Sequence, residues 1–132
     1  MEPMRILQPE GWARPRGYSN GIAARGEVIF VAGQIGWNAA GEFETDDFVE
    51  QTRQALSNVV AVLAEAGVAP DRITRMTWYV ADKQQYLAAA REVGSVYREI
   101  IGDHFPAMTL AIAGLLEDRA LLEIEATAVI AE

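Results

Sequence analysis

The 132-residue sequence predicts an α+β fold in which two helices cover one face of a mixed sheet. Two segments carry apolar residues at three- and four-residue spacing, which is typical of amphipathic helices. Short segments rich in β-branched and other apolar residues are typical of strands. Because helices and strands alternate only in the middle of the chain, the order β-β-β-α-β-α-β-β favours both helices on one face. The length and even composition predict one domain, residues 1–132.

The amino-terminal part is predicted to contain three strands, at residues 4–7, 18–22 and 27–32. The second and third are separated by Ala24-Arg25-Gly26, and a glycine in so short a connection is typical of a tight β-hairpin. Residues 33–45, which two glycines interrupt, are predicted to be a loop.

Both predicted helices have recognisable ends. The first covers residues 46–66, where Asp46 or Asp47 can cap the first turn and Gly67 can end the last one. The second covers residues 83–101 and is closed by Gly102. These are the longest periodic segments of the chain, so they anchor the fold prediction.

Three further strands are predicted at residues 73–80, 108–113 and 120–130, and a turn at residues 114–119 predicts that the last two form a hairpin. In the last strand, apolar residues at even positions from Leu122 to Ile130 alternate with Glu123, Glu125 and Thr127. The polar face of this strand is therefore expected to be solvated or buried against another subunit.

The composition excludes several kinds of site. Nineteen acidic and 11 basic residues give a net charge of −8, which opposes binding to nucleic acid. The chain has no cysteine and a single histidine, His104, so no metal site is expected and His104 is expected to cap the preceding helix. No apolar run approaches the roughly 20 residues that span a bilayer, so we expect a cytoplasmic protein with no membrane partner.

Four short motifs occur in the same order as in one known protein family. They are Gly17-Tyr18-Ser19-Asn20-Gly21, Val31-Ala32-Gly33-Gln34-Ile35, His104-Phe105-Pro106-Ala107 and Glu123-Ile124-Glu125-Ala126-Thr127-Ala128. They resemble the signatures GPYSQ, SGQI, FPAR and EIEA of the RidA/YjgF family of reactive-intermediate deaminases. The resemblance covers nearly the whole chain, and the four motifs together carry far more weight than any one of them.

This resemblance implies a chorismate-mutase-like fold assembled as a homotrimer, with ligand clefts between the subunits. It also implies hydrolysis of reactive enamines and imines to keto acids and ammonia without a cofactor. By correspondence with the family's motifs, Glu123 orients or deprotonates the attacking water, Tyr18 lines the cleft, and Gly33 and Leu110 offer backbone contacts. The structural alternatives are a solvated or ion-paired Glu123 and a Tyr18 that only packs at an interface.

The sequence departs from the family's pattern where the substrate would be recognised. Met108 stands in the place of an arginine that binds the substrate carboxylate through two parallel hydrogen bonds. Ala32 and Gly94 replace a small polar residue and an asparagine. These changes argue against the standard deamination of small 2-imino acids. Met108 is instead expected to be an apolar pocket wall or an interface residue. It can line an apolar cleft together with Trp37 and Trp78, the alternative for each tryptophan being ordinary core or interface packing.

Arg16, or its neighbour Arg14, lies in the loop before Tyr18 and can replace the missing arginine, the alternative being a solvated surface residue. The sequence thus predicts a small-metabolite protein that hydrolyses an enamine or imine other than the small 2-imino acids. Two alternatives stay open. One is a non-catalytic metabolite-binding or regulatory trimer on the same scaffold, and the other is an endoribonuclease or translation inhibitor, against which the acidic balance argues.

Overall fold

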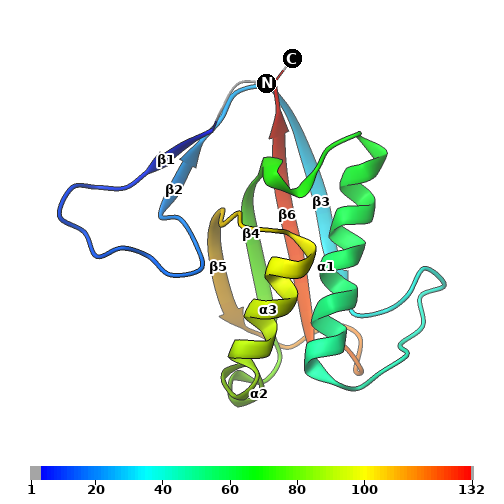
Figure 1. Cartoon of the computed structure of the whole chain (residues 1–132). Coiled ribbons are helices and arrows are strands. Elements are labelled where there is room, and N and C mark those ends of the chain that lie inside the picture. The colour runs from blue at the N-terminus through cyan, green and yellow to red at the C-terminus, as the bar shows by residue number, and fades with distance from the viewer. Residues whose placement is uncertain (1–3, 132) are drawn as a thin grey trace.

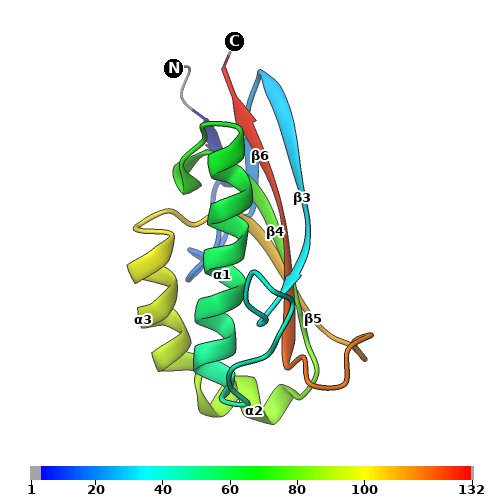
Figure 2. The same cartoon turned by 90° about the vertical axis from the view of Figure 1, so that its right-hand side faces the viewer.

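The computed structural model describes residues 4–131 and contains a four-stranded mixed sheet with two main helices on one face (Figures 1 and 2). The strands lie in the order β3-β6-β4-β5 and are β3 (Glu27–Ile35), β6 (Leu122–Ile130), β4 (Ile73–Val80) and β5 (Ala107–Ile112). β6 is antiparallel to both of its neighbours, whereas β4 and β5 are parallel. The predicted α+β class is confirmed.

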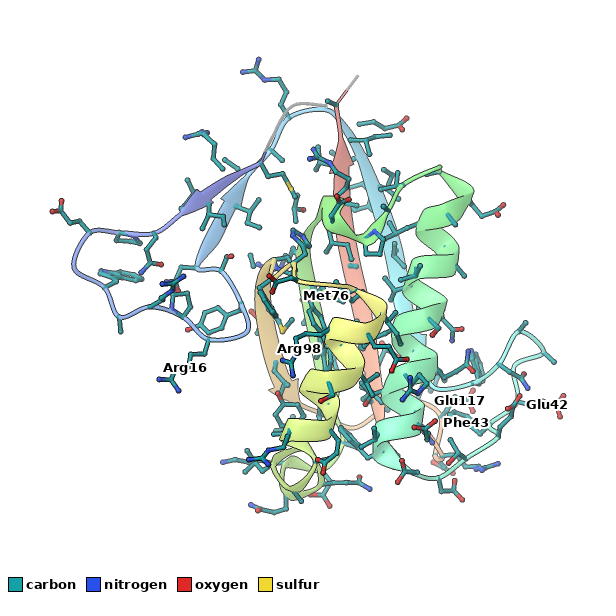
Figure 3. The ribbon with its side chains drawn as sticks, viewed as in Figure 1. Arg16, Glu42, Phe43, Met76, Arg98 and Glu117 are labelled. Carbon is teal, nitrogen blue, oxygen red and sulfur yellow. The ribbon has the colours of Figure 1, made fainter. Side chains whose placement is uncertain are left out.

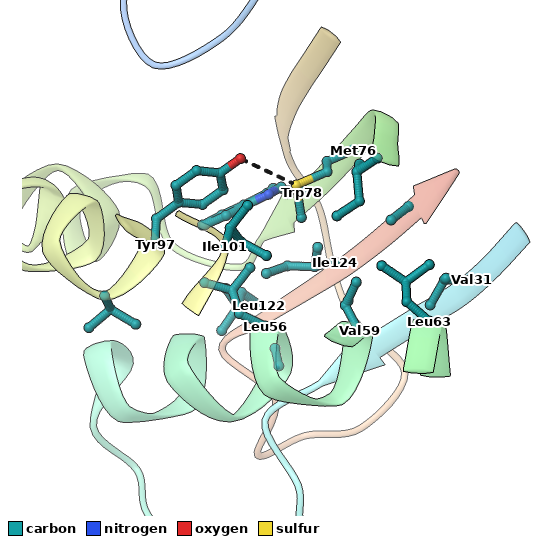
Figure 4. Packing of buried hydrophobic residues seen from close by; sticks show 14 of the residues in the cluster. Val31, Leu56, Val59, Leu63, Met76, Trp78, Tyr97, Ile101, Leu122 and Ile124 are labelled. Atoms are coloured by element: carbon teal, nitrogen blue, oxygen red, sulfur yellow. Dashed lines mark hydrogen bonds between the residues drawn. The ribbon is translucent and has the colours of Figure 1, made fainter. Parts of the chain in front are cut away.

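The first predicted helix is confirmed as α1 (Phe48–Glu65). Asp47 caps it, because its carboxylate accepts a hydrogen bond from the backbone N–H of Glu50 at 3.0 Å. The apolar stripe of α1 is fully buried against the even-numbered residues of β6, and Figure 4 shows Leu56 and Ile124 in this core. Within residues 4–131, neither α1 nor any shorter helix is apolar enough over a sufficient length to cross a membrane.

The second predicted helix is divided into α2 (Lys83–Ala88) and α3 (Ala90–Ile100). At Ala89 the backbone has φ −104° and ψ 7°, outside helical values, so the chain bends there. The bend leaves α2 at one end of the sheet and lets α3 run beside α1 over the same face (Figure 2). Gly102, with a φ of 93°, follows the end of α3 as predicted.

The predicted amino-terminal hairpin is wrong. β1 (Arg5–Leu7) pairs with β2 (Gly21–Ala23) in a separate two-stranded sheet, which projects beyond β5 in Figure 1. β3 pairs instead with β6. Gly26 does not turn a hairpin; it allows a close backbone approach, because a Cβ at this position would collide with the carbonyl of Ile130.

The predicted carboxyl-terminal hairpin is also wrong, because β5 and β6 lie on opposite sides of β4. The connection between them crosses the end of β4. It is held there by hydrogen bonds from the Ala113 N–H to the Val80 carbonyl (3.0 Å) and from the Ala81 N–H to the Leu121 carbonyl (3.1 Å). A glycine-containing polar segment signals that the chain turns, but it does not select the partner of the next strand.

Candidate functional site

The four sequence motifs form two groups in the folded chain. Ser19 joins the first motif to the third, because its N–H donates to the Pro106 carbonyl at 3.0 Å and its hydroxyl to the Phe105 carbonyl at 2.6 Å. The pairing of β3 with β6, with Val31 opposite Ala126, joins the second motif to the fourth. We call residues 17–21 and 104–110 with α3 the edge group, and residues 31–35 and 123–127 the face group.

In the face group, Glu123 lies against Gly33. A Cβ at Gly33 would lie 2.5 Å from Oε2 of Glu123 and 2.7 Å from its Cδ, so only glycine leaves room for this carboxylate. An irregularity in the pairing of β3 between Val31 and Gln34 produces this close approach. The structure thus brings together two of the residues that the sequence singled out.

The rest of the non-helical face is also polar and open. The hydroxyl of Tyr79 donates to Oε1 of Glu125 at 2.9 Å. This hydrogen bond raises the pKa of Tyr79 above its ordinary value, and partial burial and the negative charge of Glu125 act in the same direction. A shallow cavity of about 410 Å³ is lined by Glu125 together with Arg75, Thr77 and Phe30. The face group therefore offers carboxylates beside an exposed apolar surface.

In the edge group, Tyr18 is 41% exposed and lines a cavity of about 570 Å³ beneath the two-stranded sheet. Arg14 and His104 line the same cavity. Nε2 of His104 lies 2.7 Å from the carbonyl oxygen of Ile73. The expectation that His104 caps a helix is therefore corrected, because its ring holds the start of β4.

A second, smaller cavity of about 210 Å³ lies between α3 and β5. Trp78, Tyr97, Phe105 and Met108 line it. Burial raises the pKa of Tyr97, whose hydroxyl donates to a backbone carbonyl at 2.6 Å. Met108 is half-buried and packs against the core, so the structure places it as an apolar wall beside Trp78.

The other predicted site residues are placed as follows. Leu110 is half-buried and lies opposite Trp78 in the parallel pairing of β4 with β5. Trp37 lies apart from the small cavity and packs against Phe43 after β3, with ring centroids 5.9 Å apart. Arg16 is exposed and points away from the sheet (Figure 3).

One chain does not bring the two groups together. Glu123 lies opposite Tyr79, whose side chain is on the non-helical face, whereas Met108 lies opposite Met76, which is buried beneath the helices. Tyr18 lies beside the start of β5, because the next residue forms a β-bridge there. The residue of β5 that pairs with Tyr79 lies at the other end of this strand. Because side chains alternate between faces, Glu123 and Met108 cannot line one cavity within a chain.

Sequence reasoning missed Arg98, which also lines the small cavity. The sequence did contain a signal for it, because Gly94 lies one helical turn earlier and leaves room for a long side chain.

Residues 4–131 contain no group of three or more His, Asp or Glu side chains placed to hold a metal ion.

Comparisons with known proteins agree with the four motifs. Residues 12–130 match the family model described as endoribonuclease L-PSP. A RutC family protein of Pyrococcus horikoshii is 34% identical over 93% of this chain and 95% of its own length. A 2-iminobutanoate/2-iminopropanoate deaminase of Capra hircus is 31% identical over 77% of this chain and 72% of its own. The crystal structure of the Rid family protein YyfB from Yersinia pestis covers 96% of this chain and 98% of its own, at 30% identity and a TM-score of 0.85.

The match to the family model spans most of the chain, and the sequence relatives and the solved structure are consistent with it. The chain therefore belongs to the RidA/YjgF family.

Proposed function

We propose that this protein is a homotrimeric hydrolase that converts an imine or enamine of an amino acid into a keto acid and ammonia. The observation that carries the proposal is the carboxylate of Glu123, held against Gly33 on the face of the sheet opposite α1 and α3. The relative from Capra hircus that is named as a 2-iminobutanoate/2-iminopropanoate deaminase supports this class of reaction.

A second copy of the chain supplies Tyr18 and Met108, which the face group lacks. On β3, beside the carboxylates, Phe30 is 78% and Val28 47% exposed, and exposed apolar surface of this kind is typical of a subunit interface. In a closed ring of three chains, the face group of one subunit meets the edge group of the next. Each of the three clefts then contains Glu123 from one subunit and Tyr18 and Met108 from its neighbour.

The reaction needs a base, an oriented water molecule and a way to return a proton. An enamine first takes a proton at carbon and loses one from nitrogen, which gives the imine. Glu123 accepts a proton from water as the water oxygen bonds to the imine carbon and the π electrons move to nitrogen. The carboxylic acid then returns this proton to the nitrogen, which gives a carbinolamine. In the last step the carboxylate takes the proton of the carbinolamine hydroxyl and passes it to the nitrogen, the C–N bond breaks, ammonia leaves, and the C–O bond becomes the carbonyl of the keto acid. Tyr18 donates a hydrogen bond to the substrate, and backbone groups of Gly33 and Leu110 position it.

The test is hydrolysis of freshly generated imines, from 2-iminopropanoate to aromatic imino acids, by the wild type and by Glu123→Gln. We expect the substitution to lower kcat by about 10²–10⁴-fold, since it removes the base and keeps the shape. Glu125→Gln is the matched control on the same strand and face, and it is expected to keep its activity within a few-fold. Wild-type binding of keto acids without any turnover would contradict the proposal and favour a non-catalytic binding trimer, whereas RNA cleavage lost in Glu123→Gln would favour an endoribonuclease.

A further inference from the structure

The small cavity between α3 and β5 has aromatic walls. The rings of Tyr97 and Phe105 are stacked with centroids 5.7 Å apart, and the ring of Trp78 lies 6.4 Å from that of Tyr97. Tyr86 and Met108 also line the cavity. The cavity volume is about 210 Å³, and an apolar cavity of about 150 Å³ is large enough to bind benzene. One aromatic ring therefore fits this space.

Trp78 lines the cavity with its ring and not with its indole N–H. Trp78 is only 3% exposed, and its N–H is buried and has no hydrogen-bond partner among the described residues. Its place in the core is shown in Figure 4. Because the N–H is buried, a molecule in the cavity meets the indole as an apolar wall.

A cation lies beside the same cavity. Arg98 projects from α3 across Gly94, where Nη1 and Nη2 lie 3.5 and 3.9 Å from the place that a Cβ of Gly94 would occupy (Figure 3). In residues 4–131 the salt bridges are made by Arg53 and Arg119, and Arg98 takes part in none of them. Because Gly94 has no side chain, the guanidinium of Arg98 lies directly beside the aromatic cavity.

We infer that Arg98 binds the carboxylate of an aromatic substrate whose ring fills the cavity lined by Trp78 and Met108. This inference rests on the proposed function and names its substrate class: imino acids, or their enamines, with an aromatic side chain. The planar guanidinium of Arg98 binds the carboxylate through two hydrogen bonds, and the ring packs against Tyr97 and Phe105.

Binding of stable keto acids tests this assignment independently of turnover. Phenylpyruvate, pyruvate and the neutral phenylacetamide are titrated calorimetrically against the wild-type protein, Arg98→Met and Arg91→Met. We expect phenylpyruvate to bind the wild type about tenfold or more tightly than either of the others. Arg98→Met is expected to remove the preference for phenylpyruvate over phenylacetamide, while Arg91→Met, on the same helix and away from the cavity lining, keeps it.

Unchanged discrimination in Arg98→Met, or tighter binding of pyruvate than of phenylpyruvate, would overturn the inference even if Glu123-dependent hydrolysis is found. Conversely, Arg98-dependent binding of phenylpyruvate without hydrolysis of its imine would leave the inference standing and reject the proposed function.

Discussion

The face group and the edge group differ in the chemistry they offer. The face group holds carboxylates, Glu123 and Glu125, beside a shallow cavity, whereas the edge group surrounds a smaller cavity with aromatic rings and the guanidinium of Arg98. Alternation along the strands puts Glu123 and Met108 on opposite faces. The carboxylate and the aromatic cavity are thus separated within one chain, and the proposed reaction requires a second chain to bring them together.

The largest effect is expected from mixing two inactive variants. Glu123→Gln removes the base of the face group, and Arg98→Glu places a negative charge where the substrate carboxylate binds in the edge group. Each variant alone is expected to be inactive. Co-expressed in equal amounts, the two variants are expected to assemble at random, so that about one quarter of all clefts combine two intact groups. We therefore expect about a quarter of wild-type activity in the whole co-expressed population; no recovery would mean that both groups act within one chain.

Stability should separate the two faces of the sheet as clearly as activity does. Ile124 is fully buried beneath the helices, and Ile124→Ala is expected to lower the free energy of unfolding by about 2–5 kcal/mol because it leaves a cavity. Thr109→Ala, at an exposed position of β5 on the non-helical side, is expected to change it by less than about 0.5 kcal/mol. Urea denaturation measures both, and similar losses would show that the non-helical side is as tightly packed as the core.

The sequence predicted most elements but not which strands pair. Helix α1 was predictable because its apolar period is long and Asp47 caps it. The strand β6 was predictable because its alternation is regular. Both hairpins were wrong because strand partners are selected by distant segments, β6 between β3 and β4, and a glycine such as Gly26 shows only that the backbone needs freedom.

Site residues that belong to a motif were predictable from the sequence. A site residue whose position depends on contacts with distant segments was not. Gly33 and Glu123 belong to separate motifs, and the strand pairing brings them into contact. Met108 was expected to form an apolar wall, and it does so with Trp78. Arg98 belongs to no motif; Gly94 signalled only room for a long side chain, and the bend at Ala89 and the approach of α3 to β5, which no local pattern reveals, place Arg98 at the cavity.

A smaller effect on activity is expected when Gly33 is replaced. Gly33→Ala places a methyl group against the Glu123 carboxylate, whose flexible end must move away. A misplacement of about 1 Å can reduce a rate about 10²-fold, so we expect kcat to fall about 10–100-fold with the trimer intact. Gly114→Ala is the matched control, since a Cβ there meets no atom within 4 Å. Steady-state kinetics and light scattering check both variants, and full activity in Gly33→Ala would remove Glu123 from its proposed position.

The smallest effect concerns the charge of the face group. The hydrogen bond to Glu125 raises the pKa of Tyr79 in the folded protein. Its stabilising contribution is therefore complete below the ordinary pKa of tyrosine and is lost as the pH rises through the raised value. Glu125→Gln should lower the pKa of Tyr79 toward the ordinary value. Ultraviolet titration of tyrosinate, with Tyr79→Phe to identify the signal, measures this shift. Superimposable titrations of the wild type and Glu125→Gln would show that the pair is not formed in solution, and that the face group has one more free carboxylate beside Glu123.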